Sequence, residues 1–263
     1  MNKTKIFLAA AILLAGSGFL SCKKKTLDDT TNNNSNNNNN NNNNTTQVPA
    51  VFSHFSSTVT ISADASYVTL KSNGLPDHKS PYYLGTQWDP ALYEAYNGSN
   101  PNFVLNPNRI KSQNLTFKIP INPAAASTHE ATPLGPIGIS VNGVPLFNQY
   151  AGPNTPLTNE INSFDQYNGH PQQQGQYHYH VEPLYITANK GRDALIGFLL
   201  DGFPVYGPLE NGTTLTTADL DAYHGHTGPT ADYPSGIYHY HITADAPYIN
   251  GDGFWGTKGS VTQ

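Results

Sequence analysis

The tetrapeptide Tyr-His-Tyr-His occurs twice in this chain, at residues 177–180 and 238–241. In an extended strand the side chains alternate between two faces, so the two histidines of each copy share one face and the two tyrosines share the other. A Gly-His pair upstream of each copy supplies a third histidine. Two imidazoles from a strand and a third from a nearby loop are a frequent ligand set for zinc or copper, which predicts one metal-binding triad per copy. The predicted ligands are His170, His178 and His180 in the first triad and His226, His239 and His241 in the second.

Three further residues are candidate metal ligands. Asp165 and Asp221 stand five residues before the histidines of the two Gly-His pairs. Each is either a fourth ligand or a hydrogen-bond acceptor that fixes the tautomer of an imidazole. His78 ends a turn-forming segment, residues 74–78, that can deliver an additional ligand. His224 is less favoured, because its counterpart in the first copy is Asn168.

A simpler interpretation competes with the metal site. Alternation of tyrosine and histidine also describes a half-buried strand whose tyrosines lie in the core and whose histidines are solvated. The pattern occurs twice, however, and each copy has an equivalent upstream Gly-His pair. This repetition favours metal binding over chance placement of the histidines.

The histidines belong to a larger internal duplication. Residues 138–147 and 197–206 each place a turn, Asn142-Gly143 or Asp201-Gly202, between two apolar runs. Asn-Gly and Asp-Gly are the sequences that type I′ hairpin turns prefer, so both segments are predicted hairpins. The hairpins align at an offset of 59 residues, the Asp-x-Tyr-x-Gly-His segments at 56 and the Tyr-His-Tyr-His segments at 61. The two repeats span about 136–187 and 196–247.

These elements predict an all-β domain over residues 49–263. The sequence has 20 prolines and 23 glycines, which argue against long helices. A duplicated unit of this size buries its apolar face against its twin, which predicts a pseudo-symmetric β-sandwich or barrel built from two hairpin-plus-strand units. We expect the histidine strands to lie near the pseudo-symmetry axis.

The first 48 residues predict an export signal and a tether. Two lysines, a short apolar run at 6–14 and small residues lead to Cys22, the single cysteine of the chain. This pattern indicates a lipoprotein signal peptide over residues 1–21, with cleavage before Cys22 and lipidation of its thiol. The ending resembles lipoproteins of the Bacteroidetes group, which implies a lipid anchor in the cell envelope, at the outer membrane. Residues 22–48, with asparagine at 36–44, predict a disordered tether.

Composition excludes some classes of function. The formal net charge is −5, and it becomes −7 when residues 1–21, with their two lysines and no acids, are removed. A nucleic-acid partner is therefore not expected. A single cysteine allows no disulfide within the chain, so the stability must come from the core and from any bound metal.

With these motifs in view, the chain resembles the YHYH domain family over most of residues 50–263. Besides the two Tyr-His-Tyr-His segments, the resemblance rests on residues 72–78, 106–110, 201–208 and 225–227. The resemblance implies an exported or surface protein, but the name of the family describes a motif and no reaction.

Three classes of function remain. The first is a cell-envelope lipoprotein that binds a transition metal, copper or zinc, through the paired triads, because imidazole suits both metals and sulfur ligands are lacking. The second is a metal-dependent hydrolase or oxidoreductase with an open coordination position, in which Asp165 or Asp221 is the general base. The third is a module that binds carbohydrate or a partner protein through exposed aromatic side chains. The aromatic candidates are Trp88, Tyr93, Tyr96 and Trp255.

Overall fold

The computed structural model describes residues 47–251 and 253–263. The signal segment 1–21, the lipidation site Cys22 and all but the last two residues of the tether 22–48 lie outside the described residues. The described part is built mainly from strands, which confirms the all-β prediction. Its helical elements are η1 (Ala50–His54), η2 (Pro81–Tyr83), η3 (Glu160–Ser163), α1 (Leu184–Lys190) and η4 (Thr217–Asp219). Within the described residues, no helix has both the length and the apolar character that a membrane crossing requires.

The larger sheet has eight strands and contains the internal duplication. Its order is β14-β15-β11-β10-β4-β5-β9-β8, so the sheet shows equivalent strands when it is read from either edge. A pseudo-twofold axis therefore passes between β4 and β10. The first repeat contributes β4 (Pro136–Ser140), β5 (Pro145–Phe147), β8 (Gly169–Pro171) and β9 (Tyr177–Tyr179), and the second contributes β10 (Leu195–Leu199), β11 (Pro204–Tyr206), β14 (Gly225–Gly228) and β15 (Ile237–His241).

The junction between the repeats is an antiparallel strand pair. Ile139 of β4 lies opposite its own repeat equivalent, Phe198 of β10, so the axis passes through this pair. Gly138 and Gly197 are equivalent residues on either side of it. A Cβ atom on Gly138 would lie 2.4 Å from the carbonyl oxygen of Phe198, and one on Gly197 would lie 2.2 Å from that of Ile139. Glycine is thus required at both positions, because the two backbones approach too closely for a side chain.

Both predicted hairpins form, but with a different turn from the one expected. In the first hairpin the amide of Gly143 donates to the carbonyl of Ser140 (2.8 Å), and Gly143 has φ of 88°. The central turn residues are thus Val141 and Asn142, and the glycine follows them in the left-handed conformation. This is a type I turn with a glycine bulge, and the second hairpin repeats it with Gly202 at φ of 87°. The type I′ assignment was therefore wrong by one position.

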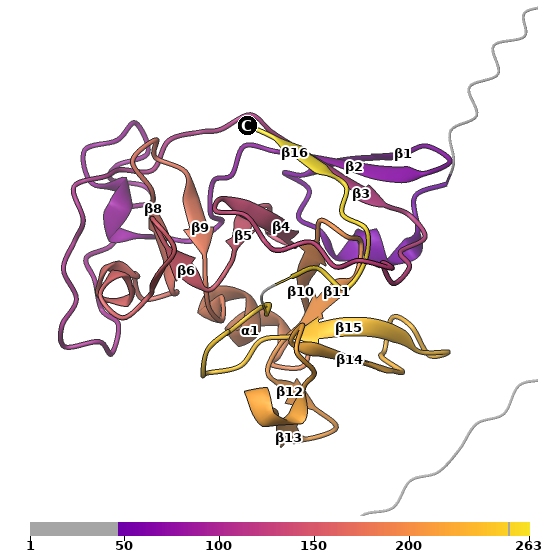
Figure 1. Cartoon of the computed structure of the whole chain (residues 1–263). Helices are drawn as coiled ribbons and strands as arrows, with labels where there is room; N and C mark the ends of the chain where they lie inside the picture. The colour runs from indigo at the N-terminus through magenta and orange to yellow at the C-terminus, as the bar shows by residue number, and fades with distance from the viewer. Residues whose placement is uncertain (1–46, 252) are drawn as a thin grey trace, which may run out of the picture. The chain divides into compact units, whose positions relative to one another are not determined.

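The histidine strands lie far from the pseudo-symmetry axis. Strands β9 and β15 are each second from an edge of the eight-stranded sheet, and β4, β5, β10 and β11 lie between them (Figure 1). The expectation that the histidine strands flank the axis is wrong, because the hairpin strands β4 and β10 make the contact between the repeats. Two separate histidine sites follow, one in each half of the sheet.

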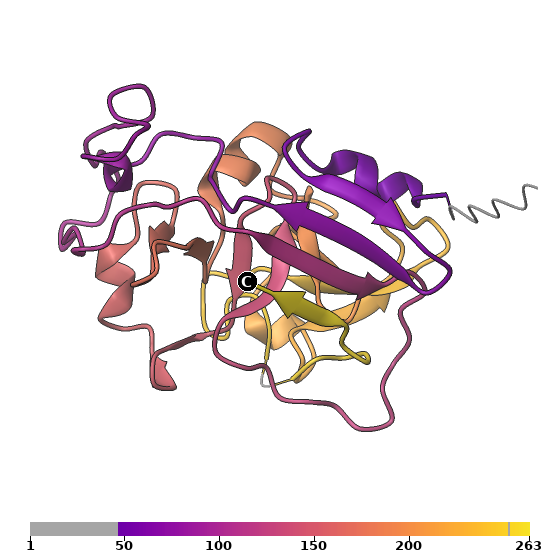
Figure 2. The same cartoon turned by 90° about the horizontal axis from the view of Figure 1, so that it is seen from above.

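A four-stranded sheet forms the second layer. Its order is β1-β2-β3-β16, and Figure 2 shows it from above, crossing in front of the larger sheet. Leu70 and Phe117 from this sheet share one buried core with Ile139 and Phe198 from the larger sheet. Neither sheet closes on itself, so the architecture is a sandwich and not a barrel. The four strands are β1 (Thr60–Ala63), β2 (Tyr67–Ser72), β3 (Leu115–Pro120) and β16 (Ser260–Thr262).

Each repeat also carries a short two-stranded ribbon followed by a 3-10 helix. In the first repeat η3 follows the ribbon, and in the second η4 does. These two segments differ in sequence between the repeats, unlike the sheet strands. The ribbons are β6 (Tyr150–Ala151) with β7 (Thr155–Pro156), and β12 (Leu209–Glu210) with β13 (Thr213–Thr214).

Candidate metal centres

The six predicted histidines gather in two clusters, one in each repeat. Antiparallel pairing places His170 of β8 directly opposite His178 of β9, and His226 of β14 directly opposite His239 of β15. The third histidine lies two residues further along the chain, on the same face: His241 ends β15, and His180 directly follows β9. A glutamate joins each triad, and in each group of four the ligand atoms all lie within 4.8 Å of one another. The N-terminal cluster is Glu160, His170, His178 and His180, and the C-terminal cluster is Glu210, His226, His239 and His241.

The N-terminal cluster has the spacing of a tetrahedral metal site. The Nε2 atom of His178 lies 3.1 Å from Nε2 of His170 and 3.0 Å from Nε2 of His180. The Oε1 atom of Glu160 lies 3.2 Å from Nε2 of His170. Metal–ligand bonds of about 2.0–2.1 Å in a tetrahedron separate neighbouring ligand atoms by about 3.3–3.4 Å. The three observed separations are slightly shorter than these values, and all four ligand atoms lie within 4.8 Å of one another, so the group can surround one ion.

Hydrogen bonds on the far side of the rings fix which nitrogen faces the cluster. The Nδ1 atom of His178 lies 3.1 Å from the carbonyl oxygen of Gln176, and Nδ1 of His180 lies 2.6 Å from that of Asn148. A carbonyl oxygen only accepts, so Nδ1 carries the hydrogen in both rings. In a neutral imidazole Nε2 is then a lone-pair donor to a metal, and in both rings it points into the cluster.

The third ring of this cluster is fixed through a serine. The hydroxyl of Ser163 donates to the carbonyl of Glu160 (2.8 Å), so its oxygen accepts the hydrogen from Nδ1 of His170, also at 2.8 Å. In its neutral form each of the three rings therefore turns an unprotonated Nε2 toward the same point, beside a carboxylate oxygen. Four acceptors and no donor meet there, and a bound cation satisfies all four.

The C-terminal cluster repeats this arrangement. Oε1 of Glu210 lies 3.4, 3.5 and 3.9 Å from Nε2 of His226, His239 and His241, respectively. All three Nε2 atoms are buried and have no hydrogen-bond partner. The outer nitrogens of two rings again face carbonyl oxygens, because Nδ1 of His239 lies 3.0 Å from the oxygen of Ile237 and Nδ1 of His241 lies 2.8 Å from that of Gly207.

Burial sets the charge of the ring ligands. Loss of hydration lowers the pKa of His180 and His241 to about 4, and it lowers the pKa of His178 and of His239 as well. The contact with His170 lowers the pKa of Glu160. At neutral pH these rings are uncharged and this carboxylate is ionised, which is the protonation state that metal coordination requires.

Comparison with known proteins identifies the family. The family model described as YHYH protein matches residues 116–217 and 209–253. The chain belongs to the YHYH family. The matched segments contain every residue of both clusters. No curated protein and no solved structure matches the chain.

In this YHYH-family protein the two candidate aspartates lie outside the clusters. Asp165 is buried on the tyrosine face, where its carboxylate accepts hydrogen bonds from the hydroxyls of Ser80 (2.6 Å) and Tyr177 (2.8 Å). Asp221 accepts from the hydroxyl of Tyr238 (3.0 Å) and from the amide of Gly225 (3.1 Å). Each aspartate therefore fixes the turn before a Gly-His pair and makes no contact with the imidazoles. The structure places neither as the fourth ligand nor as the partner of an imidazole.

His78 and His224 also lie outside the clusters. His78 is buried, with Nε2 3.1 Å from the hydroxyl of Tyr179 and Nδ1 3.0 Å from the carbonyl of Lys79. His224 has φ of 72°, in the left-handed region that its counterpart Asn168 occupies at 66°. Neither residue belongs to either group of converging ligand atoms, so the structure gives neither of them a place in a ligand set.

The fourth member of each cluster was missed by the sequence analysis. Glu160 is the first residue of η3, whereas Glu210 ends β12. At the hairpin offset of 59 residues, the position equivalent to Glu210 is Ala151. A search for acids conserved between the repeats therefore selects Asp165 and Asp221 and passes over both glutamates.

Proposed function

We propose that this YHYH-family protein binds two transition metal ions, one in each cluster, through three imidazole nitrogens and one carboxylate oxygen. The observation that carries the proposal is the convergence of four acceptors and no donor in the N-terminal cluster, with the outer hydrogens of the rings committed elsewhere. Zinc and copper are the preferred ions, because the donor set is imidazole and carboxylate without sulfur.

The non-equivalent glutamates support the same function. Duplication of the chain accounts for two histidine triads, but it does not account for two carboxylates that reach them from unrelated backbone positions. Glu160 comes from a 3-10 helix and Glu210 from a ribbon, yet each places Oε1 against Nε2 atoms of its triad. This coincidence is explained if each triad needs one negative charge beside it. A bound divalent cation would create that need.

The site of action that we propose is the cell envelope. The support comes from the amino-terminal sequence, in which a short apolar run ends at Cys22 as in a lipoprotein signal. A lipid on Cys22 would hold the protein at a membrane, and residues 22–48 would separate the metal sites from the surface. We propose the outer membrane as that surface.

The carbohydrate-binding alternative gains no support from the positions of its aromatic candidates. Trp255 stacks on Tyr238 with ring centroids 4.4 Å apart, and Tyr96 stacks on Phe103 at 3.8 Å. Trp88 and Tyr93 are partly buried against the main core. The four rings therefore pack against the protein itself and form no shared exposed platform.

Elemental analysis of protein purified without a histidine tag tests the proposal. After incubation with zinc and gel filtration, we expect two ions per chain in the wild type, one in His178→Ala, one in His239→Ala and none in the double variant. His54→Ala is the matched control, because His54 is exposed and pairs with Asp232 outside both clusters, and it should retain two ions. A double variant that keeps the wild-type zinc content, or a wild type that binds neither zinc nor copper, would overturn the proposal.

A further inference from the structure

The N-terminal cluster is enclosed by aromatic rings. Phe147 stacks on His178 with ring centroids 3.9 Å apart and an interplanar angle of 22°. Phe164 meets His170 edge-on at 4.8 Å. The three histidines of this cluster are only 2–3% exposed. An ion at this position would be sealed from solvent on its imidazole side.

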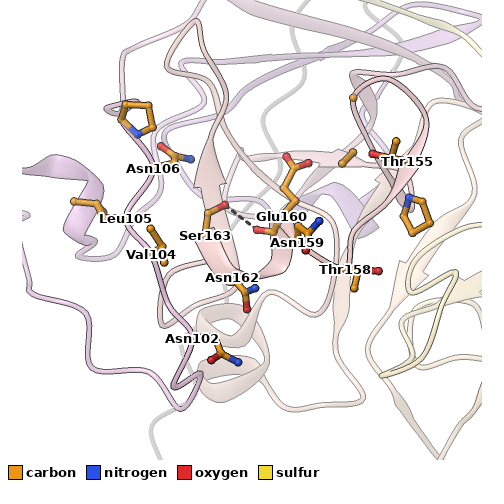
Figure 3. A pocket seen from close by; sticks show the side chains of 14 residues that line it. Asn102, Val104, Leu105, Asn106, Thr155, Thr158, Asn159, Glu160, Asn162 and Ser163 are labelled. Carbon is orange, nitrogen blue, oxygen red and sulfur yellow. Dashed lines mark hydrogen bonds between the residues drawn. The ribbon is translucent and has the colours of Figure 1, made fainter.

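A cavity beside the N-terminal cluster reaches its carboxylate but not its rings. This cavity has a volume of about 830 Å³, and Figure 3 shows Glu160 and Ser163 among the side chains that line it. None of the three histidines is part of its wall. Glu160 therefore stands between the cavity and the point on which the ring nitrogens converge.

The C-terminal cluster is open by comparison. A cavity of about 360 Å³ has His239, His241 and Glu210 in its wall. The side chain of His226 is 32% exposed, against 4% for its counterpart His170. The three Nε2 atoms are themselves buried, but two of the rings and the glutamate line a cavity, and the ring of His226 is partly in solvent.

Two substitutions between the repeats account for the difference. Tyr206 stands where the first repeat has Phe147, and it meets His239 edge-on, at 5.5 Å and 83°, because its hydroxyl is bonded to Asp232 (2.9 Å). Leu220 stands where the first repeat has Phe164 and supplies no aromatic ring. The ring that covers the imidazoles of the N-terminal cluster is therefore turned aside in the C-terminal cluster.

We propose that the metal of the C-terminal cluster has an exchangeable coordination position that faces this cavity and takes a small monodentate anion, whereas the metal of the N-terminal cluster does not. The inference rests on the proposed metal binding. A site with four protein ligands is closed at coordination number four, so an exogenous ligand requires expansion to five, which zinc reaches at some catalytic sites. The cavity beside the C-terminal cluster has room for that ligand. The enclosed N-terminal cluster has no such room beside its imidazoles.

The cavity also limits the size and charge of the ligand. A volume of about 360 Å³ lies near the lower end for small-molecule sites, so the ligand is small. A divalent ion with one glutamate and three neutral rings has a net charge of +1, which attracts an anion. The other residues of the cavity wall are mixed in character. Leu209, Pro229, Ala231 and Pro234 are apolar, whereas Asp193, Tyr206, Asn211 and Thr230 are polar or acidic. The carboxylate of Asp193 disfavours a ligand with more than one negative charge.

Cobalt(II) provides the test, because its visible absorption reports the coordination number, and sodium azide is the anionic probe. In wild-type protein loaded with two cobalt ions, we expect added azide to change the visible absorption until the change saturates. The size of the change at saturation should correspond to one of the two ions in each chain. The same change should occur in His178→Ala, which keeps only the C-terminal ion. In His239→Ala, which keeps only the N-terminal ion, the spectrum should stay unchanged.

The variant Ala231→Trp tests the role of the cavity independently of metal binding. Ala231 is exposed at the cavity wall and is not one of the proposed ligands, so the indole would occupy cavity space while all four ligands stay in the chain. We expect azide affinity to fall at least tenfold while two cobalt ions remain bound. Bound cobalt with no azide response, an equal response from both ions, or unchanged azide affinity in Ala231→Trp would overturn this inference alone. Failure to bind cobalt at all would instead overturn the proposed metal binding.

Discussion

The Nε2 atoms of His170 and His178 lie 3.1 Å apart, and with both rings neutral neither atom carries a hydrogen. Two lone pairs at this separation repel each other unless a cation lies between them. A proton satisfies at most two of the four ligand atoms, whereas a metal ion satisfies all of them. With neutral rings, the folded chain without metal would hold unfavourable electrostatic energy in this cluster, and the proposed metal ion would relieve it.

Metal binding should consequently raise thermal stability. At a free zinc concentration 100 times the dissociation constant, each occupied site adds about 2.7 kcal/mol to the free energy of unfolding. Two sites in a domain of this size should raise Tm by on the order of 10–20 °C. Differential scanning calorimetry with and without zinc measures the increase, and excess EDTA should reverse it. Equal Tm values with zinc and with EDTA would contradict the prediction.

Acid should destabilise the metal-free protein through its buried histidines. The pKa of His241 falls from 6.5 to about 4 on folding, so between these values the unfolded chain binds more protons and stability decreases as the pH falls. This group alone should remove about 2 kcal/mol between pH 7.5 and pH 5. Buried Asp201 has its pKa raised to about 6 and acts in the opposite direction, so the wild type must be compared with a variant that lacks the histidine.

Urea unfolding of wild type and His241→Gln isolates this contribution. Without metal, the wild type should lose about 2 kcal/mol more than the variant between pH 7.5 and pH 5. His54→Ala, which removes an exposed histidine, is the control and should follow the wild type. Parallel pH profiles for wild type and His241→Gln would show that the imidazole is not held neutral by burial.

Replacing either glutamate should weaken zinc binding at one cluster only. In Glu160→Gln and Glu210→Gln a neutral amide takes the place of the charge, and we expect at least about a tenfold loss of affinity, the lower end of what changes around metal ligands produce. Competition with a chromophoric chelator measures both sites. Glu182→Gln, which loses an ion pair with Arg192 outside the clusters, should bind zinc as the wild type does. Wild-type affinity in both cluster variants would exclude the carboxylates as ligands.

Asp221→Ala should affect stability but not metal content. The carboxylate accepts hydrogen bonds from the amides of Tyr223 and Gly225 and from the hydroxyl of Tyr238, and it contacts no imidazole. Loss of these bonds should lower the free energy of unfolding by about 1–3 kcal/mol. Two zinc ions should still bind at saturation, as shown by elemental analysis of the folded variant. Loss of one ion at unchanged stability would restore Asp221 as a ligand.

The sequence was most informative where periodicity dictates structure. Strand alternation predicts that His178 and His180 share a face, and the duplication predicts that His239 and His241 do the same. The glutamates could not be found in this way, because Glu160 and Glu210 do not obey the repeat. Their positions depend on where the ribbons and 3-10 helices fold back onto the sheet, and no local pattern in the sequence encodes that contact.

The repeat pattern also could not predict where the pseudo-twofold axis lies. A duplication shows that two units match, but it does not show which strands join them. Gly138 and Gly197 carried the relevant signal, because only strands that lack side chains at these points can approach so closely. The role of these two glycines can be recognised only in the folded structure, where the two backbones lie side by side.

The junction of β4 and β10 resembles the interface of a twofold homodimer. Gly138 lies opposite Leu199 and Gly197 opposite Ser140, so the pairing has the same form when the two repeats are exchanged. Two identical subunits joined in this way would have to carry identical metal sites. Covalent linkage of the two halves removes that restraint, and a single chain can then combine one enclosed cluster with one that is open to a cavity.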